Sequence, residues 1–112
     1  MLHQLCHIKD IPPNSSKSIS VEFEPRPIDL FLIRKEGQIY AYKNYCPHTG
    51  ANLNWQEDQF FDYFNEFIQC AIHGALFAID SGLCVRGPCV GAYLQPIKIQ
   101  IKSDFVYASL EL

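Results

Sequence analysis

Alternating polar and apolar positions dominate this chain, and they predict short β-strands. In a half-buried strand every second side chain faces the core, which gives a period of two. The predicted strands cover residues 18–23, 29–34, 38–43, 59–64, 67–69, 75–79, 97–102 and 105–108. No amphipathic segment of 10 or more residues predicts a helix. We therefore expect an all-β protein.

Turn residues separate these strands. Proline removes a hydrogen-bond donor from a β-ladder, so Pro25 and Pro27 should end the first strand. A glycine supplies the positive φ that a tight hairpin needs. The predicted turns lie at 35–37, 65–66, 80–82 and 103–104.

Length and composition indicate one soluble domain over residues 1–112. The chain is 48% hydrophobic and 13% aromatic, enough for a packed core. No apolar run approaches the roughly 20 residues that span a bilayer, and the first residues lack the pattern of a signal peptide. A net charge of −3 argues against a nucleic-acid partner. We expect a cytoplasmic protein with no membrane contact.

Charge is unevenly distributed along the chain. Between Lys43 and Arg86 there is no lysine or arginine, whereas five acidic residues give this span a charge of −5. These acids are Glu57, Asp58, Asp62, Glu66 and Asp80. They could attract a basic partner, although solvated hairpin turns are the simpler interpretation.

Two short loops carry the candidate chemistry. The first reads Cys46-Pro47-His48-Thr49-Gly50 and the second Cys70-Ala71-Ile72-His73-Gly74, with 21 residues between His48 and Cys70. Structural zinc of the Cys₂His₂ kind usually pairs cysteine with cysteine and histidine with histidine. Here each loop offers one of each. This arrangement suits a binuclear centre in which one iron takes both sulfurs and the other both imidazoles.

These loops resemble the Rieske iron–sulfur family, whose ligand loops read C-x-H-x-G and C-x-x-H-G. The resemblance runs from about Ile28 to Tyr107, and Gly82…Gly87-Pro88 is similar to the family's proline loop. It implies an all-β, Rieske-type antiparallel β-sandwich with a small cluster-binding subdomain of two loops, at about residues 44–90.

The resemblance also implies a cofactor, one [2Fe–2S] cluster per chain. Cys46 and Cys70 would bind the inner iron, and His48 and His73 the outer iron. These four residues are the predicted metal ligands, and no catalytic residues are predicted.

Departures from the respiratory branch of the family imply a low-potential, ferredoxin-type protein. That branch has an extra cysteine in each ligand loop, joined as a disulfide, and this chain has neither. It also places Ser and Tyr hydroxyls where this chain has Ala75 and Phe77. Because hydrogen bonds to the cluster stabilise its reduced state, their loss lowers the potential.

Several other residues are candidates for a structural or functional role. Cys84 and Cys89 flank Arg86-Gly87-Pro88 and could form a disulfide or contact the cluster ligands, whereas free buried thiols are the ordinary outcome. Cys6, near His3 and His7, is assigned no role. Trp55, Phe60 and Phe64 are expected in the core. Arg86 is expected to pair with a nearby carboxylate or to contact a partner.

Three functions are compatible with these residues. The first is a monomeric one-electron carrier that takes electrons from a reductase, expected to contain flavin, and passes them to an oxygenase or another redox enzyme. The second is a small subunit of a stable enzyme, such as a nitrite reductase. The third is a redox-inactive structural or zinc-binding module. The hairpin at residues 60–67, which lengthens the gap between the ligand loops, could form a partner surface.

Overall fold

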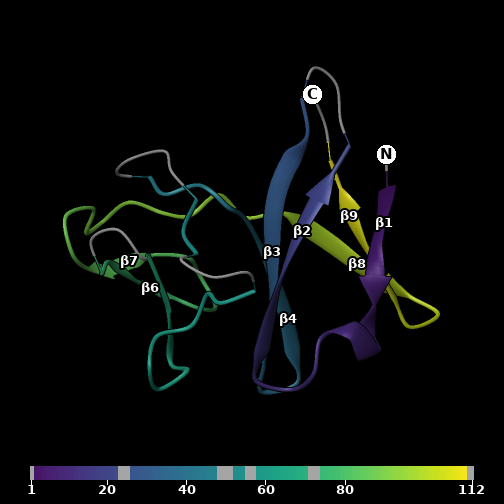
Figure 1. Cartoon of the computed structure of the whole chain (residues 1–112), viewed down its shortest axis with the longest axis horizontal. Coiled ribbons are helices and arrows are strands. Elements are labelled where there is room, and N and C mark those ends of the chain that lie inside the picture. Colours follow the sequence, from purple (N-terminus) through teal and green to yellow (C-terminus); the bar gives the residue numbers. More distant parts are fainter. Residues whose placement is uncertain (1, 23–25, 48–51, 55–57, 71–73, 111–112) are drawn as a thin grey trace.

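The described structure consists of three small antiparallel sheets (Figure 1). It is a computed structural model that describes residues 2–22, 26–47, 52–54, 58–70 and 74–110. One sheet has the order β1-β9-β8, with β1 Leu2–His7, β9 Phe105–Ser109 and β8 Lys98–Lys102. The second contains β2 Ser15–Val21, β3 Ile28–Lys35 and β4 Gln38–Lys43, in that order. The third contains β5 Phe67–Gln69, β6 Leu76–Ala78 and β7 Cys84–Arg86.

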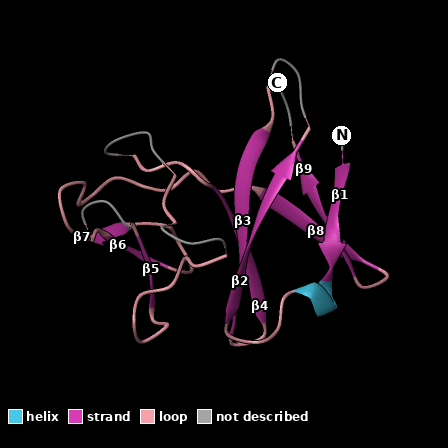
Figure 2. Ribbon diagram, viewed as in Figure 1, coloured by secondary structure: helices cyan, strands magenta, loops and turns pink. Residues whose placement is uncertain are grey.

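The expected all-β class is confirmed (Figure 2). One 3₁₀ turn, Ile8–Asp10, is the helical element within the described residues, and no described helix is long and apolar enough to cross a membrane. His7 begins this turn by accepting a hydrogen bond at Nδ1 from the Lys9 amide, 3.0 Å away. The first two sheets lie together on one side of the molecule, and the third lies beside them among longer loops (Figure 1).

Strand β3 connects two hydrophobic cores. Leu30 and Leu32 belong to the core shared with β9, whereas Phe31 and Ile33 belong to the core beneath the third sheet. All four side chains have no exposed surface. Both faces of β3 are therefore covered, as its uninterrupted apolar sequence favours. Strand β3 therefore contributes side chains to both hydrophobic cores.

Two strands and the 3₁₀ turn were not predicted from the sequence, and one predicted strand is wrong. The missed strands are β1, which pairs with β9, and β7, which pairs with β6. The predicted strand at 59–64 is a loop that contributes a single bridge, between Phe61 and Ile68. Its aromatic run lacks a partner strand of matching length because β5 is only three residues long and pairs mainly with β6.

The predicted hairpin turns are confirmed. Glu36 and Gly37 have φ values of 52° and 78° between β3 and β4, and Ser103 and Asp104 have φ values of 50° and 67° between β8 and β9. Two successive residues with positive φ match the right-handed twist of the paired strands.

Candidate metal centre

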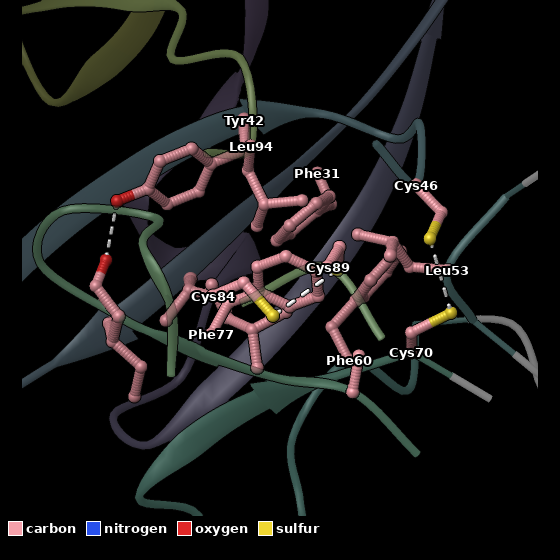
Figure 3. Close-up of a cluster of buried hydrophobic side chains, with 14 residues drawn as sticks. Phe31, Tyr42, Cys46, Leu53, Phe60, Cys70, Phe77, Cys84, Cys89 and Leu94 are labelled. Atoms are coloured by element: carbon pink, nitrogen blue, oxygen red, sulfur yellow. Dashed lines mark hydrogen bonds between the residues drawn. The ribbon is translucent and has the colours of Figure 1, made fainter. Parts of the chain in front are cut away.

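Cys46 and Cys70 meet in space although they are 24 residues apart. Their Sγ atoms lie 3.7 Å from each other, and both residues are buried (Figure 3). Cys46 follows β4, and Cys70 follows β5 directly. The structure thus brings together the two cysteines that the loop motifs singled out.

Backbone hydrogen bonds hold Cys70 at the start of the second ligand loop. The Cys70 amide donates to the carbonyl of Ala75 at 2.9 Å, and the Gly74 amide donates to the carbonyl of Cys70 at 2.9 Å. Gly74 has a φ of 66°, a conformation that glycine adopts without steric cost. Both polar groups of the Cys70 backbone are therefore hydrogen-bonded.

The Asn44 side chain forms hydrogen bonds across the first ligand loop. Its side chain is buried, its Oδ1 accepts from the Leu53 amide at 2.7 Å, and its Nδ2 donates to Asn54 Oδ1 at 3.0 Å. One side chain thus joins the beginning and the end of the loop that contains Cys46. The sequence gives no signal for this role beyond an asparagine shortly before the cysteine.

The segment between the two loops is also anchored. The Asp58 carboxylate accepts from the Ser18 amide at 2.6 Å and from the Ser18 hydroxyl at 2.9 Å, and the Asp58 carbonyl accepts from the Ser16 hydroxyl at 2.6 Å. Asp58 is thus a hydrogen-bonded, half-buried group that ties this segment to β2. The solvated-turn interpretation of the acidic residues fits Asp80, which is exposed, but not Asp58.

A third loop packs against the second. Gly87 has a φ of 109°, and a Cβ added there would lie 2.8 Å from the Cα of Ala75. Such a distance is a steric clash, so only glycine allows this close approach. Gly87 of the predicted proline loop therefore lies against Ala75, the residue that follows the second ligand loop. Arg86, beside it, is exposed and makes no ion pair with any residue that the structure describes.

Cys84 and Cys89 are a second close pair of thiols. Their sulfurs lie 3.2 Å apart, and no disulfide joins any of the chain's five cysteines, all of which the structure describes (Figure 3). Burial raises the pKa of Cys89 to about 12, helped by its hydrogen bond with Cys84 and by the nearby sulfurs of Cys84, Cys46 and Cys70. The pair is therefore a thiol contact rather than a disulfide.

The aromatic residues near the loops divide into buried and exposed ones. Phe60 is fully buried and stacks on Phe31, with ring centroids 4.2 Å apart, as predicted. The expectation for Phe64 is wrong, because it is 72% exposed and its neighbour Tyr63 is 91% exposed. Both stand on the turn before β5, where their rings form a T-shaped pair with centroids 5.1 Å apart. Trp55 lies outside the described residues.

The two sulfurs fit a shared metal. Thiolates bound tetrahedrally at about 2.3 Å from one metal lie about 3.8 Å apart, close to the 3.7 Å between Cys46 and Cys70. The predicted ligands His48 and His73 lie outside the described residues. Two thiols held together in a buried position, each at the start of a loop, can supply the sulfur half of a mixed sulfur and nitrogen site.

Two buried thiols held close together in an all-β fold are suited to binding an iron–sulfur cluster. The Rieske [2Fe-2S] domain model matches residues 1–102. The chain belongs to the Rieske [2Fe-2S] family, and its cofactor is a [2Fe–2S] cluster.

Known relatives by sequence are much longer than this chain. It is 43% identical over 60 residues to cholesterol 7-desaturase of Caenorhabditis elegans, a match that covers 53% of this chain and 13% of the relative. It is 38% identical over 53 residues to cholesterol 7-desaturase of Xenopus laevis, covering 47% of this chain and 11% of that protein.

Solved structures share the fold at low sequence identity. The ferredoxin of carbazole 1,9a-dioxygenase from Nocardioides aromaticivorans IC177 aligns over 99% of both chains, with a TM-score of 0.76 and 16% identity. The terminal oxygenase of carbazole 1,9a-dioxygenase from Novosphingobium sp. KA1 aligns over 96% of this chain but 29% of its own, with a TM-score of 0.76 and 19% identity.

Proposed function

We propose that this chain is a one-electron carrier whose [2Fe–2S] cluster is bound by Cys46, His48, Cys70 and His73. The observation that carries the proposal is the 3.7 Å contact between two buried ligand thiols in a Rieske-family chain. The cysteines would hold one iron, and the histidines the other. The cluster supplies a site that accepts and releases a single electron.

Residues around the thiols favour a low reduction potential. Ala75 and Phe77, which follow the second loop, are buried and have no hydroxyl to donate to the cluster or its ligands. Acidic residues between the ligand loops also disfavour an added negative charge. Rieske potentials extend from about −150 to +300 mV, and we place this protein near the lower limit.

Exposed apolar residues stand beside three of the buried cysteines in the sequence. Tyr45, Val85 and Val90 are exposed, and each is the sequence neighbour of a buried cysteine. Exposed apolar residues around a polar site are typical of protein-binding surfaces. We propose that a reductase and an electron acceptor bind here in turn.

We propose an oxygenase as the acceptor and the cytoplasm as the location. The ferredoxin of carbazole 1,9a-dioxygenase, which aligns over its whole length, and the desaturase relatives both support an oxygenase system. Five cysteines without a disulfide among them are consistent with a reducing compartment. A monomer suffices for this role.

A second candidate function is that of a small subunit in a stable enzyme assembly. The exposed pair Tyr63 and Phe64 favours it, because large aromatic side chains at a surface are typical of protein interfaces. Size-exclusion chromatography of native extract distinguishes the two functions: a carrier elutes alone, and a permanent subunit elutes with a larger protein.

The test of the proposal is cluster analysis of the purified protein. We expect two irons and two sulfides per chain, a Rieske-type EPR signal after reduction and a reversible one-electron titration. Cys46→Ser and His73→Ala should abolish the signal, whereas Cys6→Ser, on the distant strand β1, should retain it. Zinc without sulfide in the wild-type protein would instead support the structural-module function.

A further inference from the structure

We propose that Cys84 and Cys89 are a redox modification site, which oxidises to a disulfide that fastens the Gly87–Pro88 loop against Ala75, the residue that follows the second ligand loop. Their sulfurs lie 3.2 Å apart and belong to the buried core beneath the third sheet (Figure 3). A disulfide bond of about 2.05 Å requires them to approach by only about 1.2 Å.

Backbone hydrogen bonds bring the two cysteines together. The Cys84 amide donates to the Ala92 carbonyl at 2.8 Å, and the Gly91 amide donates to the Cys84 carbonyl at 3.1 Å. Within the returning segment the Ala92 amide donates to the Cys89 carbonyl at 2.9 Å. The segment after Cys89 thus returns to pair with the backbone of Cys84. The backbone hydrogen bonds therefore hold the two sulfurs close together.

The reaction is thiol–disulfide exchange with a low-molecular-weight disulfide such as oxidised glutathione. The two S–H bonds of Cys84 and Cys89 break and one S–S bond forms between them. The two electrons and two protons pass to glutathione disulfide, which becomes two thiols. Cys89 is the more exposed of the pair and lies between the exposed residues Pro88 and Val90, so it is the position that the oxidant can reach first.

Oxidation should act on the second ligand loop through Gly87. This residue lies inside the ring that a Cys84–Cys89 bond would close, and it packs directly against Ala75. Ala75 in turn accepts the hydrogen bond of the Cys70 amide. Closing the ring limits how far Gly87 can move from Ala75, and so restrains the residue that accepts the hydrogen bond of the Cys70 amide.

Trypsin provides a direct test of the bond, because it cleaves after Arg86, between the two cysteines. Peptide 44–86 then contains Cys46, Cys70 and Cys84, and peptide 87–98 contains Cys89 alone. The cluster-loaded protein is incubated with oxidised glutathione, its free thiols are alkylated during unfolding, and the digest is analysed by mass spectrometry. We expect the two peptides to be joined, and to separate on reduction.

Matched variants identify the partner of Cys89. The joined peptides should disappear in Cys84→Ser and in Cys89→Ser, and remain in Cys6→Ser. If peptides 44–86 and 87–98 stay unlinked in wild-type protein at a large excess of oxidised glutathione, or remain joined in Cys84→Ser, the proposal is wrong. This peptide mapping does not depend on electron transfer. The disulfide proposal can therefore fail while the electron-carrier function holds, and the electron-carrier function can fail while the disulfide forms.

The rate of cleavage at Arg86 in the folded protein tests the effect on the loop. Arg86 is exposed and lies within the ring that the disulfide closes. Trypsin should cleave oxidised protein at Arg86 several-fold more slowly than reduced protein. The cleaved fragments are quantified after the disulfide has been reduced, so that linked fragments are also counted. Cys89→Ser should show no change on oxidation. Equal rates for oxidised and reduced wild-type protein would disprove the fastening of the loop.

Discussion

Gly87 and Ala75 are in backbone contact across two loops of the candidate metal centre, and the contact leaves no room for a side chain on Gly87. A Cβ there would lie 2.8 Å from Ala75 Cα and 3.0 Å from Ala75 Cβ. The third loop can therefore approach the second ligand loop only because residue 87 is glycine.

Gly87→Ala should destabilise the protein and weaken cluster retention. The substitution adds the clash with Ala75 to the strain of a φ of 109°, and together they should lower the free energy of unfolding by about 2 to 4 kcal/mol. Chemical denaturation and the cluster absorbance measure both effects. Gly91→Ala is the matched control: φ is 92° there, but nothing lies within 4 Å, so only the backbone strain is added. Equal losses in the two variants would contradict the role of the Ala75 contact.

Asn44→Ala should loosen the loop that contains Cys46. The substitution leaves the buried Leu53 amide without its acceptor and removes the bond to Asn54, at a cost of about 1 to 3 kcal/mol. We expect reduced iron content and faster amide hydrogen exchange at Leu53. Asn44→Asp preserves the acceptor for Leu53, so it should retain more cluster than the alanine variant. If Asn44→Ala retains a full cluster, the loop does not depend on this side chain.

Tyr42 should make the protein sensitive to alkaline pH. Its hydroxyl donates to the Ile79 carbonyl at 2.6 Å, and burial, followed by the nearby Asp80, raises its pKa to about 12. The unfolded chain ionises tyrosine near pH 10, so the folded state favours the neutral phenol. This stabilisation is complete below about pH 10 and is lost as the pH rises through about 12.

Denaturation across this pH range tests the role of Tyr42. The free energy of unfolding of the wild-type protein should fall between about pH 10 and 12. The Tyr42→Phe variant should be about 1 kcal/mol less stable at neutral pH, but its free energy of unfolding should fall less over this pH range. Tyr45→Phe, at an exposed position, should follow the wild type. Identical alkaline curves for Tyr42→Phe and the wild type would contradict the assignment.

Phe60 and Phe64, four residues apart, should respond very differently to substitution. Phe60→Ala removes a fully buried ring stacked on Phe31 and should cost about 3 to 5 kcal/mol. Phe64→Ala removes an exposed ring and should change the stability by less than about 0.5 kcal/mol. Thermal or chemical denaturation of both variants measures the difference. A large loss in Phe64→Ala would mean that its ring is packed against the protein.

Much of this protein could be predicted from local sequence. The alternation in β2, β8 and β9 and the continuous apolar run of β3 reflect side-chain burial, which acts on each strand in place. The glycine and positive-φ turns at Glu36–Gly37 and Ser103–Asp104 are set by the conformational preferences of single residues. The motifs with Cys46 and Cys70 pointed to a pair of thiols that the structure places 3.7 Å apart.

The features that local sequence did not predict depend on interactions between segments far apart in the chain. Strand β1 exists through its pairing with β9 at the other end of the chain, and within the loop at 59–64 Phe60 is buried against Phe31 whereas Phe64 is exposed. Asn44 and Asp58 hold their loops through side-chain bonds to partners 9 and 40 residues away, and such partners leave no pattern in the local sequence. The sequence alone thus determined which residues are candidate ligands, because a motif is a local property. Only the tertiary structure decided what holds those residues together, because hydrogen bonds and close packing depend on where the folded backbone places each group.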